Sequence, residues 1–139
     1  MTYILILVSL VSLWGANASK EIIKFPPETV SKIKAVDAQC VSEVGASDDA
    51  LQKTFPWNLP NNENNRKYLF CLCNKLKLAK DDGTFDFDVA KKHFTSSSKL
   101  DEIKKVFDEC NILSEKDKYE LAYEITDCFF NNAPVELAM

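Results

Sequence analysis

Five cysteines are the residues of this 139-residue chain whose chemistry is most distinctive. Cys71 and Cys73 are separated by a single residue in the stretch LFCLCNKL, whereas Cys40, Cys110 and Cys128 each stand alone. Thiols in such a pattern can hold a metal ion, act as a redox pair or form disulfides. Because five is an odd number, at least one thiol has no partner within the chain.

The spacing of Cys71 and Cys73 argues against a metal site and against a redox pair. On a helix their side chains point about 200° apart, so they cannot hold one ion together. A zinc site takes four ligands, and the chain has one histidine and no second closely spaced cysteine pair. A thioredoxin-type motif needs two intervening residues. Cys73 shares a helix face with Leu69, Leu72 and Leu76, so we expect it to be a buried free thiol and Cys71 to form a disulfide.

No catalytic residue, cofactor or metal ligand is expected elsewhere. An enzyme needs an activated nucleophile or an acid–base pair, and the sequence contains neither a G-x-S-x-G motif nor a glycine-rich phosphate loop. The stretch LAKDDGTFDFDV, residues 78–89, fails as a calcium loop because its first, third and twelfth positions lack suitable ligands. The single histidine, His93, is either a pH sensor or a partly exposed surface residue.

Residues 1–18 are expected to be a secretory signal peptide. An apolar run from Tyr3 to Trp14 is followed by Ala-Asn-Ala, which has the pattern of a cleavage site. The run is shorter than the roughly 20 apolar residues that span a bilayer. A retained membrane anchor is the alternative. Cleavage after Ala18 leaves residues 19–139, which we expect to be one secreted, extracellular domain in which disulfides persist.

The charge and hydropathy of the chain narrow the classes of partner. The formal net charge is −4, and no basic stripe is present that could neutralise phosphates, so we expect no nucleic-acid partner. No segment after the signal peptide is long and apolar enough for membrane insertion. Charges of both signs alternate along the chain, which favours a soluble protein.

The elements that must position these residues are predicted to be six helices. Glycine is nearly absent, and apolar residues recur at the i, i+3, i+4 spacing of helices. The first helix should begin at Pro26-Pro27 and stop at Gly45, and a polar loop should occupy residues 58–67. Ser47, Ser98 and Ser114 are the candidate caps of later helices. The expected helical stripes occupy residues 27–44, 47–55, 68–76, 89–94, 98–110 and 114–129. We expect the end of the chain, NNAPVELAM at residues 131–139, to be apolar enough to pack back onto this compact all-α domain.

The sequence KYLFCLCNKLKLAKDDGTFD, together with the cysteine spacing, resembles the third-helix region of insect odorant-binding proteins. Six-cysteine members place their second cysteine four residues before the third and their fifth nine residues before the sixth. Those positions are Lys67 and Tyr119 in this sequence. Because the two missing cysteines bond each other in the family, their joint absence matches the four-cysteine subclass called minus-C. The extra Cys73 and Lys77, where many members have glycine, depart from the family pattern.

The resemblance implies a structure and a function. The remaining family disulfides map to Cys40–Cys71 and Cys110–Cys128, and the six helices should enclose an apolar cavity. The aromatic residues, which could equally fill a solid core, would then line a pocket for small hydrophobic ligands such as odorants or pheromones. Tyr119 and Tyr123 are the candidate hydrogen-bond donors. By helical facing and family analogy, we expect the pocket to be lined by Leu51, Phe55, Leu72, Leu76, Phe94, Tyr119, Ala122, Tyr123 and Val135.

The partners and the alternatives also follow from this resemblance. Besides a small hydrophobic ligand, an odorant receptor is the protein partner that it suggests, and we expect a monomer or a weak dimer. The same fold could instead serve as a carrier outside olfaction, in haemolymph, a gland or venom. A different class of function is a secreted protein-interaction module.

Overall fold

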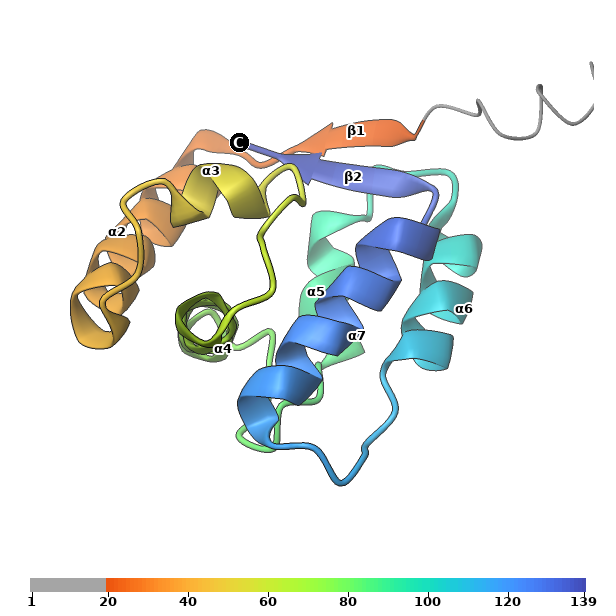
Figure 1. Ribbon diagram of the computed structural model, residues 1–139. Helices are drawn as coiled ribbons and strands as arrows, with labels where there is room; N and C mark the ends of the chain where they lie inside the picture. Colours follow the sequence, from red (N-terminus) through yellow and green to blue (C-terminus); the bar gives the residue numbers. More distant parts are fainter. Residues whose placement is uncertain (1–19) are drawn as a thin grey trace, which may run out of the picture.

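Helices form almost all of the secondary structure in the computed structural model, which describes residues 20–139 (Figure 1). The expected all-α, six-helix architecture is therefore confirmed, with a short two-stranded sheet added to it. The expected signal peptide, residues 1–18, lies outside the described residues. In chain order the elements are β1 (Glu21–Lys24), α2 (Pro27–Val44), α3 (Ala50–Thr54), α4 (Glu63–Lys75), α5 (Phe87–Ala90), the 3-10 turn η1 (Lys91–His93), α6 (Leu100–Cys110), α7 (Lys118–Asn132) and β2 (Val135–Ala138).

The helix ends follow local rules, although not always at the predicted residue. Helix α2 begins at Pro27 and ends at Gly45, which adopts a left-handed conformation as expected. The predicted caps Ser47, Ser98 and Ser114 are wrong. Helix α7 begins after Asp117 instead, because the carboxylate of that residue accepts hydrogen bonds from two backbone amides of the first turn. Helices α3 and α6 begin without a side-chain cap, and α4 begins at residue 63, inside the stretch predicted as a loop.

Two disulfides connect the helices in pairs. Cys40–Cys71 joins α2 to α4 with the two Cα atoms 5.8 Å apart, and Cys110–Cys128 joins α6 to α7 with a separation of 5.7 Å. These are the pairs that the resemblance implied. Cys73 is buried and free, and it lies on the inner side of α4 while Cys71 reaches outward to α2.

The two ends of the described part of the chain form a parallel sheet that was not predicted from the sequence. Strand β1 pairs with β2 in the register Glu21 to Val135 through Lys24 to Ala138. Figure 1 shows both strands lying together across one end of the helices. Val135 is fully buried, so the tail packs back onto the domain, but it does so as a strand.

Helix α4 packs between α2 and α7 at the centre of the fold, where Figure 1 views it along its axis. The helix buries Tyr68, Leu69 and Leu72 completely. The hydroxyl of Tyr68 donates to a carboxylate oxygen of Asp37 on α2 at 2.5 Å. Burial, and then this hydrogen bond, raise the pKa of Tyr68 well above its ordinary value, so the phenol keeps its proton.

The turn that follows α4 is fixed by side-chain and backbone contacts. Gly83 has a φ of +93°, a conformation that favours glycine. The side-chain amide of Asn111, at the end of α6, accepts from the backbone N–H of Phe85 at 2.7 Å and donates to the carbonyl of Phe85 at 2.8 Å. These two bonds imitate strand pairing and hold Phe85 in place.

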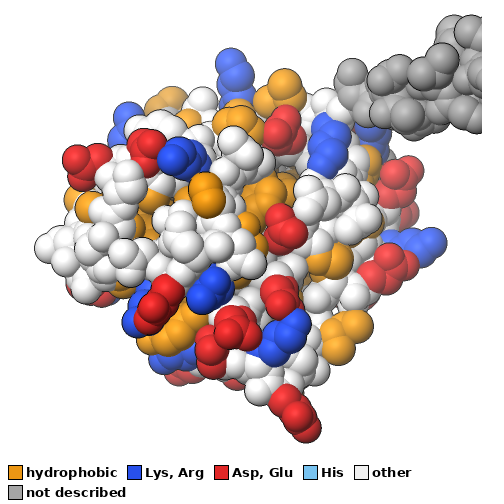
Figure 2. Space-filling view, viewed as in Figure 1, with side chains coloured by type: hydrophobic (Ala, Val, Ile, Leu, Met, Phe, Trp, Pro, Cys, Tyr) orange, Lys and Arg blue, Asp and Glu red, His pale blue; other side chains and the backbone are white. Residues whose placement is uncertain are grey.

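The surface carries mixed charges. Figure 2 shows acidic and basic side chains interspersed over the visible face. Pairs such as Lys53–Asp49, at 3.1 Å, are exposed and contribute little to stability. Within residues 20–139, no helix is long and apolar enough to cross a membrane. The same residues contain no cluster of three His, Cys, Asp or Glu side chains placed to hold a metal ion.

A first prediction concerns Gly83. A β-carbon at this position would lie 2.6 Å from the carbonyl oxygen of Lys118, so the turn packs directly on the start of α7. Gly83→Ala should therefore lower the free energy of unfolding by about 2–4 kcal/mol, measured by denaturant titration with the disulfides intact. Gly45→Ala is the control, because its φ of +69° is also left-handed but nothing lies within 4 Å; we expect about 1 kcal/mol. Equal costs at the two positions would contradict the close contact.

A second prediction concerns the missing third disulfide. The Lys67 ammonium lies 5.9 Å from the ring centre of Tyr119, so the side chains of α4 and α7 meet there. The double variant Lys67→Cys, Tyr119→Cys should oxidise spontaneously and stabilise the fold by about 1–3 kcal/mol, because the crosslink restricts the unfolded chain. The measurement is a thermal melt of the oxidised and reduced forms, with the disulfide mapped by mass spectrometry. Failure of these two cysteines to pair would contradict the alignment.

Candidate ligand-binding site

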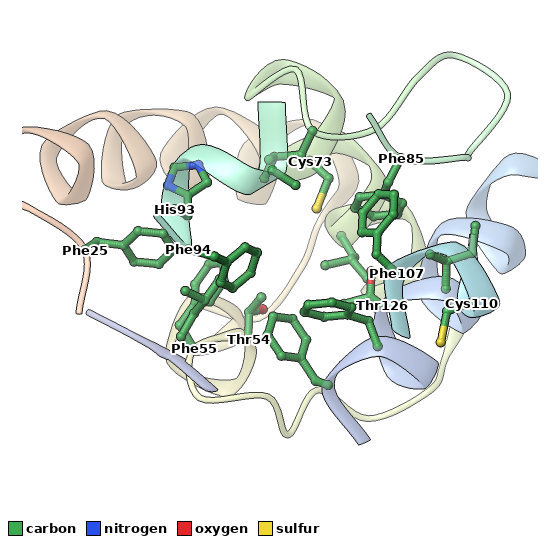
Figure 3. Close-up of a pocket in the computed structure, with 17 residues that line it drawn as sticks. Phe25, Thr54, Phe55, Cys73, Phe85, His93, Phe94, Phe107, Cys110 and Thr126 are labelled. Carbon is green, nitrogen blue, oxygen red and sulfur yellow. The ribbon is translucent and has the colours of Figure 1, made fainter. Parts of the chain in front are cut away.

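An internal cavity of about 80 Å³ lies among the helices, beside α4 (Figure 3). Its wall draws on α3, α4, the turn after α4, α5, η1, α6, α7 and β2, together with the segment that joins β1 to α2. The residues of the wall are Phe25, Thr54, Phe55, Leu69, Cys73, Leu78, Phe85, Ala90, His93, Phe94, Phe107, Cys110, Ile125, Thr126, Phe129, Phe130 and Leu137.

Phenylalanine dominates this wall, since seven of the nine phenylalanines of the chain line it. Phe129 of α7 is the common contact: its ring centre lies 5.7 Å from that of Phe94, 6.2 Å from Phe107 and 5.1 Å from Phe130. The rings meet at tilted or edge-to-face angles, which are the favoured geometries of aromatic pairs. The result is a hydrocarbon surface of packed aromatic rings around an open centre.

The two hydroxyl groups of the wall are already engaged. Thr54 Oγ1 donates to the carbonyl of Ala50 at 2.8 Å, and Thr126 Oγ1 donates to the carbonyl of Ala122 at 2.8 Å. Each bond runs back one turn along its own helix. The surface that the wall presents to the cavity therefore consists of carbon and sulfur atoms.

Cys73 contributes a thiol to the wall. Figure 3 shows its sulfur directed from α4 toward the space between the aromatic rings. Burial raises the pKa of this thiol to about 12. The thiol is therefore protonated at physiological pH and behaves as a small, polarisable apolar group, because the thiolate is the reactive form.

His93 lies at the edge of the cavity and is half-buried. Its ring packs edge-on against Phe25, with ring centres 5.3 Å apart (Figure 3). Burial lowers the pKa of this imidazole, and the positive charges of Lys32 and Lys92 lower it further. The imidazole is consequently neutral at neutral pH.

The structure places two of the nine predicted lining residues, Phe55 and Phe94, on the cavity wall. The other seven lie elsewhere. Five of them are buried in the packed core outside this wall, namely Leu51, Leu72, Ala122, Tyr123 and Val135. Leu76 is partly buried and packs against that core. The predicted disulfide cysteine Cys110 and the free thiol Cys73 do line the cavity, although neither was assigned to the ligand.

The two tyrosines predicted to orient a ligand have other partners. The hydroxyl of Tyr123 donates to the backbone carbonyl of Leu59 at 2.6 Å, which anchors the segment before α4. Tyr119 packs edge-on against Phe70, with ring centres 5.4 Å apart, in a shallow surface groove formed by α2, α4 and the start of α7. Neither tyrosine belongs to the cavity wall: Tyr123 is engaged with the Leu59 carbonyl, and Tyr119 lies in the surface groove.

Several solved structures share this fold. An odorant-binding protein from Drosophila melanogaster matches with a TM-score of 0.63 and 22% identity over 76% of this chain and 92% of its own. A fatty acid binding protein from the oral disk of the blowfly Phormia regina matches with a TM-score of 0.65 and 19% identity over 78% and 94%. Odorant Binding Protein 7 from Anopheles gambiae, solved with four disulfide bridges and an azo compound, matches with a TM-score of 0.61 and 25% identity over 77% and 87%.

Sequence comparison gives the same result. The B1 protein of Tenebrio molitor is 24% identical over 129 residues, which cover 92% of this chain and 94% of the relative. The family model of the PBP/GOBP family matches residues 23–132. These residues include all six helices and both disulfides, which fit the four-cysteine minus-C pattern. The chain therefore belongs to the PBP/GOBP family.

Proposed function

We propose that this protein is a secreted carrier that binds small hydrophobic molecules, of the odorant or pheromone kind, in the cavity beside α4. The observation that carries the proposal is the cavity itself, which has a volume of about 80 Å³ and a wall of aromatic, aliphatic and sulfur groups. A packed core rarely leaves such a space unfilled, because an empty cavity costs stability. A space of this kind is suited to hold an apolar guest.

The family supports this proposal. The blowfly structure is described as a fatty acid binding protein, and the Anopheles gambiae protein was solved with an azo compound. Both are therefore proteins that take up small molecules within the fold shared with this chain. The expected signal peptide supports secretion, in an oxidising compartment where the two disulfides persist.

The driving force for binding is the removal of apolar surface from water, worth roughly 25 cal/mol per Å². The cavity is smaller than the roughly 300–1,000 Å³ of sites for drug-sized ligands. An apolar cavity of about 150 Å³ holds benzene, so molecules of about ten heavy atoms, the size of many volatile compounds, require the aromatic wall to open further when they bind. For ligands of that size, a micromolar dissociation constant corresponds to about −8 kcal/mol of binding free energy and is the expected scale.

A third prediction tests occupation of the cavity. Ala90 of α5 is buried and lines the wall, so Ala90→Leu should fill part of the space. The affinity for a small terpene such as limonene should fall at least tenfold, because the added carbons and the ligand compete for one volume. The measurement is the equilibrium concentration of limonene vapour above solutions of each protein.

The control is Ala46→Leu, which adds the same atoms at a half-buried position outside the cavity wall. This variant should bind limonene as the parent protein does. Circular dichroism should show that both variants keep their helices. Undiminished binding by Ala90→Leu would contradict occupation of this cavity, and no uptake by the parent protein would contradict the proposed carrier function.

A fourth prediction concerns His93 and pH. Because its folded-state pKa lies below the ordinary value of 6.5, the unfolded chain binds the proton more readily. The stability linked to this residue is therefore complete above about pH 6.5 and is lost as the pH falls below that value. The melting temperature should drop more steeply between pH 7.5 and about pH 5.5 in the parent protein than in His93→Gln, whose amide does not titrate. Parallel pH profiles would show that protonation of His93 is not disfavoured by the fold.

A further inference from the structure

The cavity wall offers a ligand no oxygen or nitrogen atom with which to form a hydrogen bond, and the Cys73 thiol is only a weak partner. The donor protons of Thr54 and Thr126 are committed to backbone carbonyls, and the wall surface is made of carbon and sulfur. Within residues 20–139, the wall includes no Lys, Arg, Asp, Glu, Asn, Gln or Tyr side chain. Figure 3 shows the nitrogens of His93 on the side of its ring away from the central aromatic cluster.

A polar group that enters such a space loses its water and gains no partner. A hydroxyl or carbonyl without a hydrogen bond is disfavoured in an apolar interior, and an ionised carboxylate is disfavoured far more strongly. The positive charges of Lys32 and Lys92 lower the pKa of His93 at the edge of the cavity, but neither lysine is part of the wall. An acidic ligand would therefore find no counter-charge inside.

Resting on the carrier function proposed above, we infer that the cavity selects hydrocarbons, such as small terpene or aromatic hydrocarbons, over oxygenated molecules with the same carbon skeleton. The aromatic rings and the Cys73 sulfur supply dispersion contacts to every part of a hydrocarbon guest. The same surface gives no compensation for a hydroxyl, a carbonyl or a carboxylate. This ligand class differs from the amphiphilic fatty acids named for the blowfly protein.

The test is a matched ligand series measured by isothermal titration calorimetry. Limonene, its alcohol carveol, its ketone carvone and the related perillic acid share one carbon skeleton and differ in oxygen content. Limonene should bind at least tenfold more tightly than carveol and carvone, and perillic acid should bind most weakly. Equal or tighter binding of carveol or carvone would overturn the inferred selection while leaving the carrier function standing. No binding by any of the four would contradict the carrier function itself.

A pair of variants separates the effect of the wall from the general hydrophobicity of limonene. Cys73→Ser replaces the sulfur that faces the cavity with a smaller hydroxyl oxygen. The ratio of limonene to carveol affinity should fall about fivefold or more, because the serine oxygen faces the cavity and can accept from the carveol hydroxyl even when its own proton is donated back along α4. Cys73→Ala removes the sulfur without adding a polar atom, and its ratio should stay within about twofold of the parent value. An unchanged ratio in Cys73→Ser would show that the wall chemistry is not the source of the selectivity.

Discussion

Covalent and polar links at the margins of the helices hold this fold around an incompletely filled centre. A cavity of about 80 Å³ removes roughly 2 kcal/mol of stability at the usual cost of about 24 cal/mol per Å³. Each disulfide closes a loop, with sequence separations of 31 and 18 residues, and contributes about 3–4 kcal/mol in the chain-entropy model. The two crosslinks together therefore exceed the cost of the cavity, which lets the domain keep an open interior.

The polar contacts between segments also lie at the margins of the helices, away from the cavity. Tyr68 bonds to Asp37 across α2 and α4, and the indole N–H of Trp57 donates to Asp127 on α7 at 2.9 Å. The Asn111 side chain holds the backbone of Phe85. Each of these bonds lies outside the central aromatic cluster and positions a segment that supplies, or neighbours, a wall residue. Polar chemistry thus shapes the cavity without entering it, and this separation is what makes the cavity uniformly apolar.

Much of the scaffold was predictable from the sequence because its signals are local. The stripe of α2, its stop at Gly45 and the inward face of α4 with Cys73 follow from helical periodicity and glycine conformation. The disulfide pairs came from the family resemblance and match the structure. The β1–β2 pairing joins segments at opposite ends of the chain, and each strand has only four residues, so no local pattern indicates it.

The cavity wall was the least predictable feature. Helical facing separates buried from exposed residues, but Leu72 and Tyr123 are as deeply buried as true wall residues and lie outside the cavity. Other wall residues, such as Phe25 and Phe85, stand outside helices, where periodicity gives no information. In the sequence, Phe25 precedes the prolines at which α2 begins, and Phe85 follows the turn at Gly83. Neither pattern indicates a pocket.

Nuclear Overhauser effects between bound limonene and assigned side chains test the central claim most directly, because they locate the ligand atom by atom. We expect contacts from the ligand protons to the Ile125 methyl groups and to the ring protons of Phe94 and Phe129, which surround the cavity. Contacts confined instead to Phe70 and Tyr119 would place the ligand in the surface groove formed by α2, α4 and the start of α7 and would contradict an internal binding site.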